Sequence, residues 1–487
     1  RGRKGKFGLG RGEGAGKVAP VMRALPQTRL QALESGGILR LLLSYSWPAL
    51  VSTTLNMLYN VVDRIYIGQG CGADAIAALA LTFPVMMVVG AVGPLIGGGS
   101  ATTLSIQLGE KDAEGAERTL GQMFALKILF GLIAPFVLYF VVLDPAFRVM
   151  GAGKMNGETV LLARRYLAIV LPFMMTQHLA FGLSGAMRAE GAPVRSMRCM
   201  VLGCLANFIL DPVFIFGFHM GVAGAAWATN LAMLLSLADA LRYYFCGLSA
   251  VRIRVCRMRV YRDLLPRVLG IGLAPFLMML AMSLVNFAFN RAFATWSSTP
   301  LLATAQIASF GILHAVSGVF FTPAMGIQQG MGPIVGYNWG AKNYARVRRA
   351  ALTGLAVTLG FTTVACLVQV VFATPLAWCF ARSDPELVVH GARAIRIGNA
   401  CVWCIGLNVS ASTYFQSVGR PRTAILLSLL RQVICLIPCV CLLPYLFPGD
   451  PIKGVWLAMP ISDVVACAAS VWPWLKEMRS LRELEAA

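Results

Sequence analysis

Charged residues are scarce in this 487-residue chain, at 13% of the total, whereas hydrophobic residues make up 57%. Acidic residues are scarcer than basic ones, with 21 Asp and Glu against 42 Lys and Arg, and there are only 4 histidines. A water-soluble fold of this size has too little interior to bury so much apolar surface. The composition excludes an ordinary soluble protein and indicates that lipid is the main solvent of the chain.

Motifs of catalysis and nucleotide binding are also missing. The sequence contains no G-x-S-x-G, H-E-x-x-H or Walker motif. Most of its 13 cysteines lie inside apolar segments, which is typical of small buried side chains rather than of a disulfide framework. We therefore expect no enzymatic activity, no transition-metal site and no cofactor. The energy for the protein's function must then come from an ion gradient.

Long apolar segments recur from Ile38 almost to the end of the chain. Each has about the 20 residues that cross a hydrocarbon core of ~30 Å. They predict an all-α polytopic membrane protein without a sizeable soluble domain. The twelve predicted transmembrane helices cover residues 40–66, 76–103, 119–143, 160–185, 196–217, 220–246, 265–289, 302–332, 350–373, 389–415, 423–446 and 454–475.

Basic residues distinguish the two sides of the membrane. They gather in both tails and in alternate loops, with a large group between Arg242 and Arg267. This asymmetry follows the positive-inside rule and predicts cytoplasmic termini and a multi-pass protein of the plasma (inner) membrane. A soluble domain with a basic, aromatic face, which nucleic-acid binding requires, is absent, so no nucleic-acid partner is expected. The opposite loops hold chiefly Arg148, Lys154, Arg382 and Lys453.

The two halves of the sequence repeat at offsets of 227 to 231 residues. An even number of spans in each half makes the copies parallel, related by an axis along the membrane normal. The repeat predicts two pseudo-symmetric six-helix bundles around a central cleft, which suits alternating access. The aligned segments are 109–118 with 340–349, 191–193 with 419–421, and Pro48 with Pro275.

These landmarks divide the chain into five parts. The Gly-rich start contains no apolar stretch or cleavage site, so it is not a signal peptide, and the first residue, Arg1, leaves the native start open. We expect a monomer in the lipid bilayer. The predicted parts are a disordered basic cytoplasmic tail (1–37), an N-terminal six-helix bundle (38–246), a cytoplasmic linker (247–263), a C-terminal six-helix bundle (264–475) and a cytoplasmic C-terminal tail (476–487).

Polar residues inside the spans are the candidates for function, because a charge in lipid costs about 3 kcal/mol on insertion scales. Asp63 ends a polar stripe that begins with Asn56 and Asn60, on one face of a helix. Asn207 and Asp211 are four residues apart in the fifth span and also share a face. These two faces are the candidate ion-binding surfaces.

The depths of the candidates indicate which of them can meet. At 1.5 Å per residue, Asp211 and Thr229 of the next helix reach a common level in the outer half of the membrane. Asp63 lies farther outward, so its helix must tilt or bend, and Pro48 is the candidate hinge. Oxygen ligands suit an alkali cation, and two close carboxylates can share a proton. The alternative is that Asp63 pairs with Arg64 near the surface and Asp211 caps a turn.

Other polar residues in the spans allow two interpretations each. His178 and His314 are either hydrogen-bonded packing residues or groups that move protons or contact substrate. Arg431 and Asp463 lie in the eleventh and twelfth spans, where they can form a structural ion pair. Paired methionines offer adaptable surfaces for apolar ligands, although generic packing explains them as well. They are Met86, Met87, Met174, Met175, Met278 and Met279.

Three segments carry a resemblance to a known family: 58–68 (LYNVVDRIYIG), 207–216 (NFILDPVFIF) and 221–229 (GVAGAAWAT). Together with Pro48, they resemble the multidrug and toxic compound extrusion (MATE) family, most closely its MepA/DinF-like branch, over residues 38–475. The resemblance implies an antiporter that uses Na⁺ or H⁺ to export bulky, lipophilic and often cationic drugs. It places the amino-lobe cation site on Asp63, Asn207, Asp211 and Thr229.

The sequence departs from one branch of that family. The acidic site that this branch has in its carboxyl lobe is not evident in the present sequence. This favours ion coupling through the first half alone, and it leaves the choice between Na⁺ and H⁺ open. The amides found where acids were sought are Asn286, Asn290, Asn399 and Asn408.

Two other functions fit a polytopic membrane protein. A flippase for lipids or polysaccharide precursors predicts a cleft lined with several basic residues, whereas this sequence is expected to put basic residues in loops and acids in the spans. A membrane-embedded enzyme would need paired histidines or acids near a membrane face, and Glu158, Glu190 and the single histidines form no convincing set. A structural or receptor role is disfavoured by the intramembrane acids.

Overall fold

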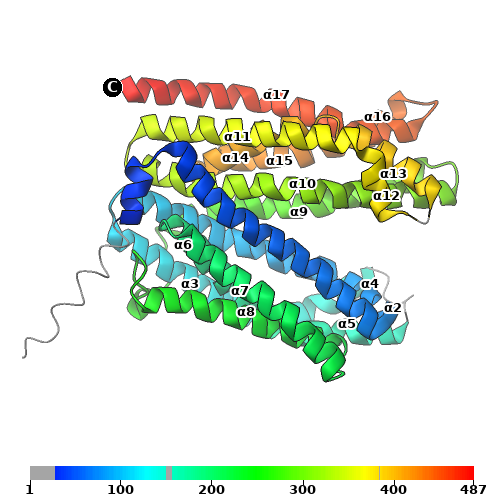
Figure 1. The fold of residues 1–487 in the computed structure, drawn as a ribbon, viewed down its shortest axis with the longest axis horizontal. Coiled ribbons are helices and arrows are strands. Elements are labelled where there is room, and N and C mark those ends of the chain that lie inside the picture. The colour runs from blue at the N-terminus through cyan, green and yellow to red at the C-terminus, as the bar shows by residue number, and fades with distance from the viewer. Residues whose placement is uncertain (1–27, 150–155, 383, 487) are drawn as a thin grey trace, which may run out of the picture.

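The computed structural model describes residues 28–149, 156–382 and 384–486, and the regular elements in these residues are helices (Figure 1). The helices are α2 (Ile38–Gly109), α3 (Ala113–Val137), α4 (Leu143–Val149), α5 (Gly157–Val170), α6 (Met174–Ala189), α7 (Pro193–Pro212), α8 (Val222–Phe245), α9 (Leu265–Trp296), α10 (Pro300–Gly340), α11 (Tyr344–Val371), α12 (Ala373–Phe380), α13 (Pro385–Gly398), α14 (Ile405–Ser417), α15 (Pro421–Leu429), α16 (Ile437–Leu446) and α17 (Pro451–Ala486).

The predicted membrane-spanning character is confirmed. Ten of the described helical stretches are long and apolar enough to cross a membrane, and the bent pair Pro385–Gly398 and Val402–Ser417 makes an eleventh. The first predicted span, 40–66, is the early part of α2, where serine, threonine and asparagine lower the mean hydropathy. This part ends at Gly72, whose φ of 78° is accessible to glycine without strain, and the second span follows.

The sequence repeat recurs in the backbone. Lys111 and Lys342 both have positive φ, of 61° and 57°, and so do Gly191 and Gly419, of 84° and 73°. The aligned loops of the two halves therefore adopt the same uncommon backbone conformation. Figure 1 shows the two halves as two groups of helices, the first coloured blue to green and the second light green to red, with the start of the described chain and the C-terminus at the same end.

Irregular turns interrupt corresponding spans in the two halves. A 3₁₀ turn at Leu171–Phe173 separates α5 from α6, and a similar turn at Val402–Cys404 separates α13 from α14. A π-helical segment follows α7 at Val213–Gly217, and another follows α15 at Leu430–Leu436. Such π segments inside helices often occur at functional sites. The first begins two residues after Asp211, and the second contains Arg431.

Glycines hold the two bundles together where α2 crosses α9 and α10. A side chain at these positions would collide with the backbone of the opposite bundle, so the helices approach more closely than other residues allow. The closest approaches are Gly272 to the Leu95 carbonyl oxygen, Gly99 to that of Val268 and Gly109 to that of Tyr337, where an added Cβ would lie 1.7, 1.9 and 1.9 Å away.

Part of the predicted disordered tail is ordered, so that prediction is wrong for residues 28–35, which form a helix. Leu33 is fully buried, and Arg346 donates hydrogen bonds to the carbonyls of Leu33 and Gly36 at 3.1 and 2.7 Å. Arg29 donates to the Leu248 carbonyl at 3.4 Å. The helix therefore contacts both the linker and the second half. Residues 1–27 lie outside the described residues.

The predicted C-terminal tail is helical and packs against the rest of the protein. Residues 476–486 continue α17 as helix, and Leu481 on that helix is fully buried. The Tyr414 hydroxyl donates a hydrogen bond of 3.1 Å to Glu477, and Arg420 forms an ion pair with the same carboxylate. These contacts fasten the end of the chain to α14 and to the loop before α15.

Candidate functional site

A central cavity of about 970 Å³ opens between the two bundles, as the repeat predicted. Its walls come from both halves, including α2, α6, α9, α10 and α14. Four of the six paired methionines line it, which favours ligand contact over generic packing for those four, whereas Met174 is buried in the N-terminal bundle. The four are Met86, Met87, Met278 and Met279.

Three of the predicted site residues meet beside this cavity. Asn207 and Asp211 are one helical turn apart on α7, and Thr229 faces them from α8. The Asn207 amide donates to Asp211 Oδ1 at 3.1 Å and to Thr229 Oγ1 at 3.5 Å. All three side chains are buried, and Asp211 has no exposed surface. The depth argument is confirmed for Asp211 and Thr229.

Asp63 joins this cluster from α2. Its carboxyl group is a direct electrostatic neighbour of the Asp211 carboxyl group. The alternative pairing is not seen: among the described residues Asp63 and Arg64 form no ion pair, and the Arg64 guanidinium lies 5.6 Å from the centre of the Phe83 ring. Pro48 lies inside α2, and a bend there stays a prediction.

The polar stripe before Asp63 also faces the cavity. Asn56 and Asn60 line it together with Asp63, as their helical spacing predicted. Sequence reasoning missed Tyr59 on the same stretch, although its position four residues before Asp63 was a usable signal. Tyr59 lines the cavity, as does Thr229 of the cluster.

Oxygen atoms without donors mark the centre of the cluster. Asp63 Oδ1, Asn207 Oδ1 and Asp211 Oδ2 are buried and have no hydrogen-bond partner. A buried acceptor without a donor is costly, and a hard cation or a shared proton removes that cost. In the described part of the chain, no group of three or more His, Cys, Asp or Glu residues could hold a metal ion.

The second half holds a different arrangement of polar groups. Arg431 Nε donates to Asp463 Oδ1 at 2.5 Å, which confirms the predicted ion pair. Asp463 is buried, whereas Arg431 lines the cavity. His314 also lines the cavity, with its ring edge-on to Phe310 at 5.0 Å.

Amides rather than acids surround this second polar region. Asn399 accepts from Ser317 at 3.1 Å and donates to Gln369 at 2.7 Å, and Asn408 donates to Ser470 at 3.0 Å. Both asparagines line the cavity. Asn286 instead donates to a carbonyl of its own helix, and Asn290 is exposed.

The expectation that basic residues are confined to loops is wrong. Arg64, Arg188 and Arg431 all line the cavity, where Asp63 is the acidic lining residue. Arg188 belongs to the last turn of α6, and its guanidinium donates to Ser184 and Ser196 at 3.1 and 2.8 Å. Charge counting by loops failed because Arg64 and Arg431 lie inside spans and because Arg188, at the end of α6, still lines the cavity.

A buried lysine lies just behind the cavity wall. Lys127 of α3 is 1% exposed and donates to the His178 carbonyl at 2.5 Å. Its Nζ fills space left by Gly97 and Gly182, where an added Cβ would lie 3.1 and 2.7 Å from it. His178 lines the cavity, and its Nε2 is buried without a partner. Sequence reasoning did not single out Lys127.

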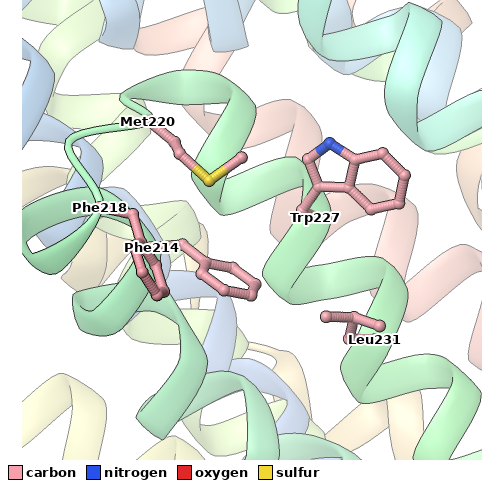
Figure 2. A pocket seen from close by; sticks show the side chains of 5 residues that line it. All are labelled: Phe214, Phe218, Met220, Trp227 and Leu231. Carbon is pink, nitrogen blue, oxygen red and sulfur yellow. The ribbon is translucent and has the colours of Figure 1, made fainter.

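A second, smaller hollow lies where α7 is followed by α8, close in sequence to Asp211 and Thr229. Figure 2 shows the rings of Phe214 and Phe218 beside the Met220 side chain, facing Trp227 and Leu231 of α8. All of these side chains are apolar, and Phe218 is 65% exposed. In a membrane protein such a surface suits lipid tails.

The sequence is similar to a known protein family and to characterised proteins. The MatE family profile matches residues 48–213 and 274–441. The chain is 26% identical over 455 residues to the multidrug export protein MepA of Staphylococcus aureus (strain N315), covering 92% of this chain and 96% of that protein. It is 25% identical over 438 residues to MepA of Staphylococcus haemolyticus (strain JCSC1435), with coverage of 89% and 92%.

Solved structures share the fold. One is an outward-facing conformation of a multidrug resistance MATE family transporter, with a TM-score of 0.85, 24% identity and coverage of 93% and 98%. Another is a transporter of the MOP superfamily from Pyrococcus furiosus, with a TM-score of 0.84, 25% identity and coverage of 93% and 98%. Because the family profile matches both halves, this chain belongs to the MatE family of multi-pass membrane transporters, which are not enzymes.

Proposed function

We propose that the protein is a secondary active multidrug exporter that moves lipophilic, often cationic drugs out of the cell in exchange for Na⁺ or H⁺. The observation that carries this proposal is the set of buried, donorless oxygens on Asp63, Asn207 and Asp211 beside a cavity large enough for a drug. The similarity to the MepA proteins over most of the chain supports the drug as cargo.

The geometry supplies a route for coupling ion and substrate. Asp63 lies between the ion cluster and the cavity because it contacts Asp211 and also lines the cavity wall. A cation or proton on the cluster neutralises Asp63, and a cationic substrate needs this carboxylate ionised. Since each ligand alters the other's affinity, the two bind in alternation. The two bundles then rock about the glycine crossings to expose the cavity on either side.

We also propose the location, topology and oligomeric state of the protein. It lies in the plasma membrane with both ends of the chain in the cytoplasm, because the basic loops lie on that side. The domain bounds are those predicted, except that residues 28–35 form an ordered helix that contacts Arg346 of the second half. We propose that a monomer suffices, since the cavity is built by one chain.

The test is transport by purified protein in proteoliposomes loaded with ethidium, with the Na⁺ and H⁺ gradients dissipated separately. Loss of one gradient should stop export and thereby identify the ion. Asp211→Asn and Asp63→Asn should abolish gradient-driven export, because each removes a charge that the ion must neutralise. Asp144→Asn is the control, since Asp144 is exposed and paired with Arg164 away from the cavity.

Normal gradient-driven export by folded, inserted Asp63→Asn and Asp211→Asn variants would refute the assignment of the ion site. Export that persists in wild type without either gradient would refute Na⁺ or H⁺ coupling.

A flippase for an anionic lipid or lipid-linked precursor is the second candidate, and the arginines on the cavity wall favour it. In that case wild type would translocate a fluorescent phospholipid between leaflets of the same proteoliposomes, and ethidium export would be absent.

A further inference from the structure

The ion pair in the second half holds an arginine against the wall of the cavity. Arg431 uses Nε to donate to Asp463, and its two terminal nitrogens have no hydrogen-bond or ion-pair partner among the described residues. The guanidinium remains charged in proteins and presents several N–H donors in a rigid fork. Two of its donor groups are therefore free for a ligand.

The Arg431 guanidinium is held in place by a buried partner, Asp463. The Asp463 side chain has no exposed surface, whereas the Arg431 side chain is 18% exposed on the side of the cavity. Asp463 sets the position of the guanidinium from behind and stabilises its charge in the membrane. The free ends then point away from the aspartate, since Nε takes the bond to it.

The helical segment that carries Arg431 contributes more than one side chain to the cavity. Arg431 lies in the π-helical segment Leu430–Leu436, and both Arg431 and its neighbour Gln432 line the cavity. Gln432 Oε1 is buried without a partner. His314 and Met459 of the second half also line the cavity, which adds one polar and one apolar side chain.

The acidic lining residue lies in the other half of the cavity. There Asp63 is accompanied by Arg64, which lies over the Phe83 ring, and by Arg188, which is hydrogen-bonded to Ser184 and Ser196. Arg431 lines the second half, where its acidic partner Asp463 is buried behind it. A purely cationic substrate satisfies Asp63 in the first half and leaves an unpaired guanidinium facing it in the second. A substrate with a carboxylate at one end and a cationic group at the other satisfies both.

We propose that Arg431 is the binding subsite for a substrate carboxylate, so that zwitterionic amphiphiles are preferred over purely cationic ones. Asp463 is its positioning residue. This inference rests on the proposed function for the cavity as the substrate site, but its binding test does not depend on ion coupling.

The test uses two dyes that differ in one group: tetramethylrhodamine, whose free carboxylate makes it zwitterionic, and its methyl ester, which is a cation. Affinities are measured by fluorescence anisotropy on the full-length protein in nanodiscs. Arg431→Gln combined with Asp463→Asn removes both charges and so avoids a lone buried carboxylate. It should weaken binding of the free acid about tenfold or more and change binding of the ester less than about twofold.

Two further variants separate charge from structure. Arg431→Lys keeps the charge and the pairing with Asp463 but not the fork, and should weaken the free acid by a smaller factor. The matched control is Arg393→Gln with Asp450→Asn, because that arginine–aspartate pair of the same half is exposed outside the cavity. It should bind both dyes as wild type does.

Equal weakening for both dyes, unchanged affinity of the double variant for the free acid, or no binding of either dye to wild type would each overturn the subsite. The export proposal is tested separately: if wild type moves neither dye along a gradient while the contrast in binding holds, export fails and the subsite stands.

Discussion

The crossing of α2 and α9 leads to a quantitative prediction for Gly272. An alanine here would place Cβ 1.7 Å from the Leu95 carbonyl oxygen, and the next atoms of the same backbone are also within 3 Å. Ordinary contact requires about twice that distance, so the helices of the two bundles must separate by roughly 1.5 Å. Neither obstacle is a flexible side chain. Overpacking of this kind costs about 1–3 kcal/mol.

A second glycine supplies the matched control. Gly360 lies in the interior of α11, and an added Cβ meets nothing within 4 Å. Both substitutions gain up to about 1 kcal/mol because alanine favours helix over glycine. We therefore expect Gly272→Ala to be less stable than Gly360→Ala by about 1–3 kcal/mol, with Gly360→Ala at or slightly above wild type.

The assay is thermal unfolding of the purified proteins in one detergent, followed by intrinsic tryptophan fluorescence. The order of Tm should be Gly360→Ala, wild type, Gly272→Ala. If Gly272→Ala unfolds at the same temperature as Gly360→Ala or above it, the two bundles do not meet at this crossing, and the account of how they are held together is wrong.

Four further variants, at three positions, test the cytoplasmic face and the buried lysine. Burial raises the pKa of Glu190 in the α6–α7 loop to about 7, against the hydrogen bond from the Ala250 N–H and the charge of Arg29. The neutral acid thus favours the folded state, and this contribution is full below about pH 4.5 and is lost as the pH rises to about 7. Glu190→Gln should therefore raise the stability above pH 7 by up to roughly 3 kcal/mol, measured by unfolding at pH 5 and 8, and an equal effect at both would contradict the account. Leu33→Ala should lower the stability by about 2–5 kcal/mol in the same assay, and a neutral result would mean that helix 28–35 does not pack as described. Lys127→Ala should lose about 2–4 kcal/mol, of which Lys127→Met recovers most because it fills the same space; a Met variant as unstable as the Ala variant would show that the amine itself is required.

Several features followed from the sequence because they depend on local composition. The membrane class followed from the apolar segments, since a hydrocarbon core sets one length for every span. The repeat followed from loop residues such as Gly191 and Gly419, whose positive φ is a local property of the turn. The pair Asn207 and Asp211 followed from spacing alone, because residues four apart share a helix face.

Other features depend on how helices lie against one another, and only the tertiary structure decided them. Asp63 reaches Asp211 from another helix, which depth along one helix did not establish. Arg188 and Lys127 look like a loop residue and an ordinary span residue, yet they lie on or behind the cavity wall. Spacing along a helix fixes which residues share a face, but the rotation and crossing of packed helices determine what that face meets.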